Sequence, residues 1–328
     1  MSSFTRRKTL ANGLVVAASG WVSTMVWAQS WPTKSIRLVV PFPPGGATDS
    51  IARLIADALA PRLEQTVTVE NKPGAASMIG VATVVKAPPD GYTLLVSGAS
   101  SYTLVPALRS KMAFDVTQDL APVALVTYAP LVVVTGADKP YQRLDDVLAL
   151  AKAKPRSLNY STYGPGSQPH LAAELLADAA GVELEPVPYK GSADALIGVV
   201  RGDVDIGIET ISAASALIKA RKLRALAVTN ARRSTFLPQV PGLEELNLAK
   251  AAIQGFYALA APAATPAAVV QRLVKEVTEI MATTEARAKC AELSLEAVTV
   301  GPEGLRSIMT TELARYRELN KRLKISMD

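Results

Sequence analysis

The chain has 328 residues, about half of them apolar, and a formal charge of +6. This length suggests two domains with a large core. No lysine/arginine block alternates with aromatic residues, so a nucleic-acid partner is not expected. Single Cys and His residues, Cys290 and His170, exclude an internal disulfide and a zinc site of the Cys/His type. We expect Cys290 to be a buried, inert thiol in a helix.

The first 28 residues have the pattern of a secretory signal peptide. Positive charge at Arg6, Arg7 and Lys8 precedes a mostly apolar stretch. Val26 and Ala28 place small residues at the positions that a signal peptidase recognises. We expect cleavage after Ala28 and export to the periplasm, by either the general or the twin-arginine route. The alternative is a membrane anchor, but several polar residues and glycines make this stretch poor for a span. Removing those three basic residues lowers the formal charge to +3.

The remaining chain alternates short β-rich runs with helical patterns, which predicts the α/β class. Many of the runs are continuously apolar, which is typical of parallel sheets covered on both faces. The expected strands are 36–40, 66–70, 92–97, 123–126, 131–135, 158–162, 184–189, 204–209, 223–229 and 257–262. The expected helices begin near residue 48 and then cover about 77–86, 144–153, 168–179, 191–201, 211–221, 266–282 and 302–323.

No long linker separates two halves of the chain. We therefore expect two domains joined by extended segments that cross between them, at 121–134 and 223–233. The first domain would be discontinuous, formed by 31–127 plus 229–328, and the second, 128–228, would be inserted into it.

The stretch 36–49, IRLVVPFPPGGATD, reads as a strand, a Gly/Pro turn and the start of a helix. It lacks the third glycine of a dinucleotide-binding turn and the lysine of a P-loop, so nucleotide binding is not expected. Free N–H groups and the helix dipole still favour an anion, and Gly45 and Gly46 allow close approach of a ligand. Asp49 either caps the helix or holds a water beside a ligand carboxylate. An ordinary strand-to-helix turn is the alternative.

The stretch 158–176, LNYSTYGPGSQPHLAAELL, repeats this design. Two such turns, one in each expected domain, could hold the two ends of a small diacid. Hydroxyl groups and glycines supply its candidate ligand contacts: Ser161, Thr162, Tyr163, Gly164, Gly166 and Ser167. His170 as a general base is disfavoured, because no strained nucleophile turn of the G-x-S-x-G type is present.

Three further side chains are candidates for the site. Ser97 and Ser101 follow an expected strand and suit either a ligand or a helix cap. Glu209 ends another strand and could line the same site, with helix capping again as the alternative. Clustered carboxylates for acid/base chemistry or a metal are absent from the sequence, so no cofactor is expected.

Several motifs together resemble the tripartite tricarboxylate transporter receptor family, also called Bug-type solute receptors. They include VENKPGAASMIG, PPDGYTLL, VPYKG and KLRALAVT, in addition to the two turns. The resemblance covers essentially all of 31–328 and implies a two-domain periplasmic binding protein of type II, hinged by two crossing strands, that closes on its ligand like a flytrap.

The resemblance also implies a ligand and a site. One carboxylate of a small organic acid would lie at Pro44, Gly45, Gly46 and Ala47, with waters positioned by Asp49 and an aromatic residue, Phe42, nearby. The other end would meet Thr162 to Ser167. The sequence departs from the family pattern near these positions at Pro43, Ala76, Glu209, Ala214 and Ala216, which leaves the identity of the acid open.

The function that follows is a non-enzymatic, monomeric receptor that delivers the acid to integral membrane transporter subunits. A ligand-sensing protein that signals to a membrane kinase is the alternative. An exported hydrolase that uses His170 is a third hypothesis.

Overall fold

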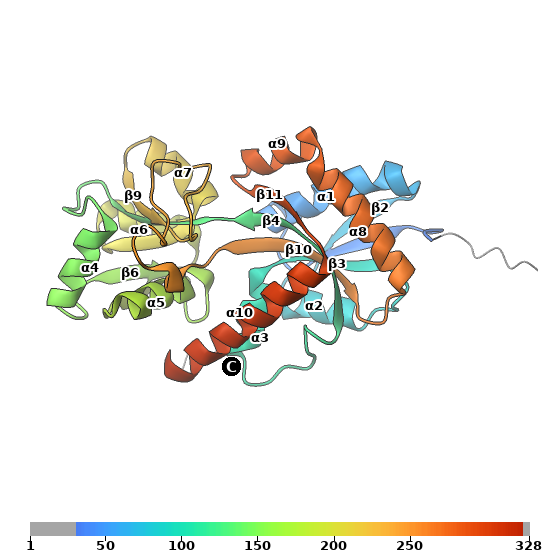
Figure 1. The fold of residues 1–328 in the computed structure, drawn as a ribbon, viewed down its shortest axis with the longest axis horizontal. Helices are drawn as coiled ribbons and strands as arrows, with labels where there is room; N and C mark the ends of the chain where they lie inside the picture. Colours follow the sequence, from blue (N-terminus) through green and yellow to red (C-terminus); the bar gives the residue numbers. More distant parts are fainter. Residues whose placement is uncertain (1–30, 324–328) are drawn as a thin grey trace, which may run out of the picture. The chain divides into compact units, whose positions relative to one another are not determined.

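The computed structural model describes residues 31–323, and the expected signal peptide lies outside them. The first sheet has the strand order β11-β4-β10-β3-β1-β2 (Figure 1). Its strands are β1 (Ile36–Val40), β2 (Val67–Asn71), β3 (Thr93–Gly98), β4 (Leu120–Ala129), β10 (Gly255–Pro262) and β11 (Glu296–Val300). Strand β1 runs parallel to β2 and β3, whereas β10 runs antiparallel to β3 and β4 and β11 runs antiparallel to β4.

The second sheet has the order β7-β6-β8-β5-β9. Its strands are β5 (Leu131–Gly136), β6 (Asn159–Thr162), β7 (Glu185–Pro188), β8 (Ile206–Thr210) and β9 (Leu223–Val228). Strand β6 is parallel to β7 and β8, and β5 is antiparallel to β8 and β9. The expectation of parallel sheets is therefore wrong for β4, β5, β9 and β10, whose pairings are all antiparallel. Apolar runs report burial on both faces, not strand direction.

Two connections join the sheets. Strand β4 leads into β5 across Pro130, and β9 returns to β10 through residues 229–254, which include η2 (Ala249–Ala251). Thr229 and Ile253 pair in this second connection, with the Ile253 N–H donating to the Thr229 carbonyl at 3.0 Å and the Thr229 hydroxyl donating to the Ile253 carbonyl at 2.6 Å. One connection leaves the first sheet and the other returns to it, so the chain runs in opposite directions through the two, in agreement with the antiparallel pairing of β4 with β10 and of β5 with β9.

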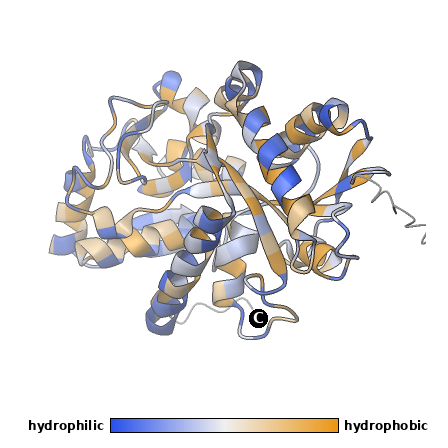
Figure 2. Cartoon of the chain, turned by 45° about the vertical axis from the view of Figure 1, so that its right-hand side comes forward, coloured by the Kyte–Doolittle hydropathy of each residue, from blue (hydrophilic) through white to orange (hydrophobic). Residues whose placement is uncertain are grey.

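Helices cover both sheets. Those of the first sheet are α1 (Ala47–Leu63), α2 (Met78–Val85), the π-helical turn η1 (Ser100–Leu104), α3 (Val105–Leu108), α8 (Ala267–Ala282), α9 (Thr284–Glu292) and α10 (Pro302–Leu323). Those of the second are α4 (Leu144–Ala153), α5 (Gln168–Ala180), α6 (Ser192–Arg201) and α7 (Ile211–Lys219). The apolar strands lie inside and the polar residues face outward on the helices (Figure 2).

Burial follows the sequence pattern closely. Ile51, Ile55 and Leu59 of α1 recur at helical spacing and are fully buried. Cys290 is buried in α9, and burial raises the pKa of its thiol to about 11, in agreement with an inert role. No helix in residues 31–323 is both long and apolar enough to cross a membrane.

Candidate functional site

The first turn connects β1 to α1. Gly46 is the N-cap of α1, with extended backbone, and Gly45 has a φ of +87°, which is strained for a residue with a side chain. Pro43, Pro44, Gly45 and Gly46 are exposed. The first N–H groups of a helix lack acceptors inside it, so the turn presents backbone donors to solvent.

Asp49 lies three residues into α1 and is only 3% exposed. Its Oδ2 accepts from the Gly45 N–H and from Arg53 Nε, both at 2.9 Å. Its Oδ1 accepts from Arg53 Nη2 at 3.1 Å and from Asn71 Nδ2 at 3.0 Å. Because a carboxylate accepts about four hydrogen bonds, the protein itself satisfies Asp49.

This arrangement favours a positioning role for Asp49 over the predicted cap and water-holding roles. The N-cap of α1 is Gly46, which has no side chain to cap the helix. Burial acts to raise the pKa of Asp49, but hydrogen bonds from Arg53, the Gly45 N–H and Asn71 outweigh it and lower the pKa to about 2. The carboxylate is therefore ionised at neutral pH. Asn71 also donates to the Phe42 carbonyl at 3.1 Å, so one amide connects both ends of the turn.

Ser97, at the end of β3, belongs to a chain of three buried hydroxyls. Ser97 Oγ donates to Ser101 Oγ at 2.5 Å, and Ser101 Oγ donates to Ser77 Oγ at 2.8 Å. Ser77 is the N-cap residue of α2. Its hydroxyl proton comes last in the chain, which makes it a donor for another acceptor. The sequence predicted Ser97 and Ser101 but not Ser77.

Ser77 ends a run of four residues with positive φ, which begins at Gly74 and includes Ala75 and Ala76. Left-handed conformation is unfavourable for non-glycine residues and concentrates at functional sites. Gly80 lets α2 approach the first turn closely, because a Cβ there would lie 2.6 Å from Pro41 Cβ. The start of α2 is therefore a neighbour of the first turn.

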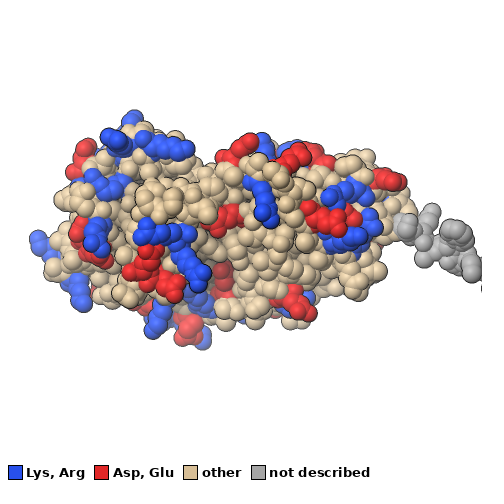
Figure 3. Space-filling view, turned by 45° about the horizontal axis from the view of Figure 1, so that its top comes forward, with Lys and Arg blue, Asp and Glu red and all other residues tan. Residues whose placement is uncertain are grey.

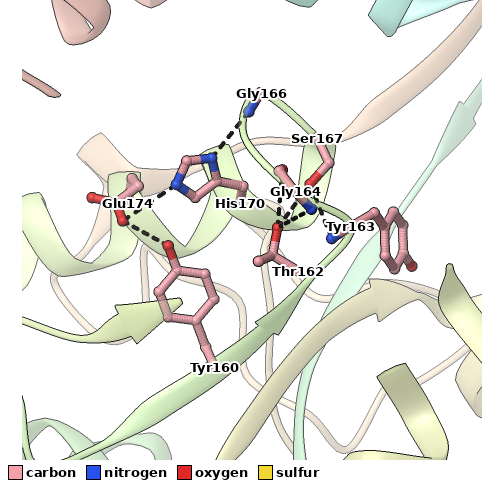
Figure 4. A network of polar contacts seen from close by, with 8 residues as sticks. All are labelled: Tyr160, Thr162, Tyr163, Gly164, Gly166, Ser167, His170 and Glu174. Carbon is pink, nitrogen blue, oxygen red and sulfur yellow. Dashed lines mark hydrogen bonds and ion pairs between the residues drawn. The ribbon is translucent and has the colours of Figure 1, made fainter. Parts of the chain in front are cut away.

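The second turn connects β6 to α5 (Figure 4). Gly164 and Gly166 have φ values of +102° and +74°. Thr162 Oγ1 and Ser167 Oγ are 2.9 Å apart, and the Thr162 hydroxyl also contacts the Gly164 N–H and carbonyl. The Tyr163 N–H donates to Ser167 Oγ at 3.3 Å. The structure therefore brings together the predicted residues 162–167 as one hydrogen-bonded turn before a helix N-terminus.

His170 lies near the start of α5 and supports the second turn (Figure 4). Its Nδ1 accepts from the Gly166 N–H at 3.0 Å, and its Nε2 lies 3.7 Å from Glu174 Oε1, which also accepts from Tyr160 Oη at 2.6 Å. Burial lowers the pKa of His170, against an opposing effect of Glu174. Nδ1, the nitrogen that a general base would use, therefore already accepts a hydrogen bond from the backbone.

Glu209, at the end of β8, is 2% exposed. Its Oε2 accepts from Tyr163 Oη and, at 2.7 Å, from Ser192 Oγ, while Oε1 has no hydrogen-bond partner among residues 31–323. Burial raises the pKa of Glu209 to about 7, although the two donors act to lower it. Glu209 does not cap α7, because the Thr210 side chain does so. Ser192, at the start of α6, was not predicted.

Two contacts place the turns near strand β10. Tyr257 hydrogen-bonds to Thr48 of α1, and burial raises the pKa of Tyr257. Gln168, the first residue of α5, approaches Gly255 so closely that a Cβ there would lie 3.0 Å from its Nε2.

Other surface features lie apart from these turns. A cavity of about 740 Å³ lies between α1, α8 and α9, and it includes Arg53 and Lys289 but neither turn. Basic and acidic side chains are interspersed on the face shown in Figure 3. In residues 31–323, no group of three or more His, Cys, Asp or Glu residues could hold a metal.

The fold is that of a periplasmic binding protein. Rpa4515 of Rhodopseudomonas palustris, solved with adipate, is similar with a TM-score of 0.77 and 31% identity over 90% of this chain and 99% of that one. MatC from the same organism, with bound malate, is similar with a TM-score of 0.73 and 28% identity over 88% and 99%. Proteins of this class are solute receptors rather than enzymes.

Sequence relationships are more specific. BugT of Bordetella pertussis is 33% identical over 317 residues, which are 95% of this chain and 97% of BugT. The model of the tripartite tricarboxylate transporter family receptor matches residues 51–325. The chain therefore belongs to the tripartite tricarboxylate transporter receptor family, as the motifs predicted.

Proposed function

We propose that this protein binds a small organic acid in the periplasm and delivers it to a tripartite tricarboxylate-type membrane transporter. Residues 1–28 would act as the export signal, with cleavage after Ala28. The acid would lie between a first domain, 31–127 plus 229–328, and a second, 128–228, and its binding would shift the protein toward a closed form. The closed monomer is the form that the transporter would recognise.

One observation carries the proposal: two positive-φ glycine turns each precede a helix at the carboxyl end of a strand. The turns lie between β1 and α1 and between β6 and α5. Ligands of open α/β sheets bind at such strand ends. Backbone N–H groups there recognise a carboxylate without a basic side chain.

The proposed ligand site combines residues of both turns with the hydroxyl chain of β3. It consists of Phe42, Pro44, Gly45, Gly46, Ala47, Asp49, Ser97, Ser101, Thr162, Tyr163, Gly164, Gly166, Ser167 and Glu209, and we add Ser77. Adipate and malate, which the two structural relatives hold, are both small carboxylates and support this ligand class.

A thermal-shift screen of the purified protein against about a hundred organic acids tests the proposal. A ligand that binds only the folded state at a hundred times its Kd adds about 2.7 kcal/mol, which raises Tm by several degrees. The corresponding neutral alcohols are the matched controls and should leave Tm unchanged. Stabilisation by none of the acids would contradict the receptor function.

A further inference from the structure

Glu209 is a buried carboxyl group that the protein satisfies on one side only. Tyr163 and Ser192 both donate to Oε2, whereas Oε1 is buried and has no hydrogen-bond partner within the part of the chain that the structure describes. Leaving a buried acceptor unpaired is unfavourable, and such groups in native proteins call for a reason. Asp49, by contrast, receives four donors from the protein.

The strands next to Glu209 locate the unpaired atom. Glu209 lies two residues after Gly207, so both residues face the same side of β8. Gly207 pairs with Ser161 of β6, and Ser161 Oγ is also buried with no hydrogen-bond partner among the described residues. A Cβ at Gly207 would lie 2.8 Å from Val199 of α6, so the side of the sheet toward α6 carries two polar side chains that each have one unpaired oxygen near the second turn.

The two turns differ in what they offer a ligand. The first presents donors: the N–H groups at the start of α1 and the hydroxyl of Ser77, which ends its chain of hydrogen bonds. The second includes, beside its own N–H groups, the acceptor Oε1 of Glu209. A carboxylate suits the first turn, and a hydrogen-bond donor suits Glu209.

We propose that Glu209 sets the ligand class: an organic acid that carries a protonated amine at its other end, in preference to a dicarboxylate. This inference rests on the receptor function proposed above and replaces the diacid expected from sequence. The amine would donate to Oε1, while Ser192 holds Oε2 in place. Tyr163 is the neighbour best placed to move aside for it, because it is half-buried and precedes Gly164 in the turn.

A protonated Glu209 would have the opposite preference, since its O–H could donate to a second carboxylate. The pKa of about 7 allows either form near neutral pH. The two possibilities differ in proton exchange: binding an amine releases the proton of Glu209, and binding a second carboxylate takes one up. Tyr163 is the titratable side chain that hydrogen-bonds to Glu209.

Isothermal titration calorimetry with two matched probe series tests the inference. The dicarboxylates are succinate, glutarate and adipate, and the amino acids are 4-aminobutanoate, 5-aminopentanoate and 6-aminohexanoate. We expect the best amino acid to bind more tightly than the best dicarboxylate. In Glu209→Gln the amide places a donor where Oε1 was, so this preference should fall by about tenfold or more.

Glu312→Gln is the matched control. Burial also raises the pKa of Glu312 to about 7, but Glu312 lies in α10 and contacts Thr103 rather than either turn. The Glu312→Gln variant should prefer amino acids over dicarboxylates to the same extent as the wild type. If Glu209→Gln does not fold, titrations of the wild type in two buffers of different ionisation enthalpy still measure whether protons are released or taken up on binding. We expect proton release when an amino acid binds.

The outcomes separate the two proposals. Tighter binding of dicarboxylates, proton uptake, or an unchanged preference in folded Glu209→Gln would overturn the role of Glu209 and leave the receptor function standing. Failure of both probe series, together with failure of the wider acid screen, would overturn the receptor function itself.

Discussion

Asp49 Oδ2 accepts a hydrogen bond of 2.9 Å from the backbone N–H of Gly45, four residues earlier. The bond ties the turn between β1 and α1 to the N-terminal end of the helix. The Gly45 backbone in this turn has a left-handed conformation. The N–H group of Gly45 is thereby used within the protein. The donors left for a ligand are those of Gly46 and the residues that follow it.

Asp49→Asn should lower the free energy of unfolding by about 2 kcal/mol, because one of the donors that Gly45, Asn71 and Arg53 direct at this buried side chain loses its acceptor. The ion pair itself adds little, since the Arg53 side chain is 53% exposed. Urea unfolding measures the change. The exposed Asp57 on the same helix provides the control Asp57→Asn, which should stay within about 0.5 kcal/mol of wild type. Equal effects of the two changes would argue against the positioning role.

Gly45→Ala should destabilise the protein by about 1–2 kcal/mol, because its φ of +87° is unfavourable for alanine. Gly46→Ala is a close control. Both glycines have open space where a Cβ would lie, but the φ of Gly46 is −82°. Thermal unfolding should therefore separate the two variants, and equal stability would show that the turn does not hold Gly45 in the left-handed conformation.

The fold could largely be predicted from the sequence because each strand and helix has its own local pattern. Strand β1 and helix α5 show this most clearly. Strand β11 was missed, since Glu296–Val300 is short and only partly buried. The direction of β5, β9 and β10 also escaped prediction, because pairing between residues far apart in the chain leaves no local pattern.

The site was predicted in part. Glycine turns are visible in sequence, so the residues of 44–47 and 162–167 could be proposed directly. Asn71, Ser77 and Ser192 could not, because each hydrogen-bonds to a predicted site residue (Asp49, Ser101 and Glu209, respectively) from an element that is distant in sequence. The unpaired Oε1 of Glu209 is likewise a product of three-dimensional packing.

Glu209 should make stability depend on pH. Its pKa in the folded state, about 7, exceeds its ordinary value of 4.5, so its contribution is complete below about pH 4.5 and is lost as pH rises through 7. Glu209→Gln should therefore gain stability over wild type between pH 5 and pH 8, as measured by Tm in parallel buffers. The exposed Glu244 offers the control Glu244→Gln, for which the difference in Tm from wild type should be the same at each pH. A constant difference for Glu209→Gln as well would contradict the burial of its charge.

His170 is the only histidine, so its titration can be followed without ambiguity in untagged protein. Nitrogen-15 NMR should show a midpoint below 6.5 and a neutral ring whose proton resides on Nε2, because Nδ1 accepts from the Gly166 N–H. Stability should fall as pH decreases through this midpoint, since protonation removes the acceptor. A midpoint above 6.5 would contradict the support of the second turn by a neutral His170.

The most direct test of the proposed function is a crystal structure of the protein with the acid that stabilises it most. We predict that one carboxylate lies within hydrogen-bonding distance of the N–H groups at Gly46 and Ala47, and that residues 162–167 contact the other end. An acid bound elsewhere, for example in the cavity between α1 and α9 beside Arg53 and Lys289, would contradict the account.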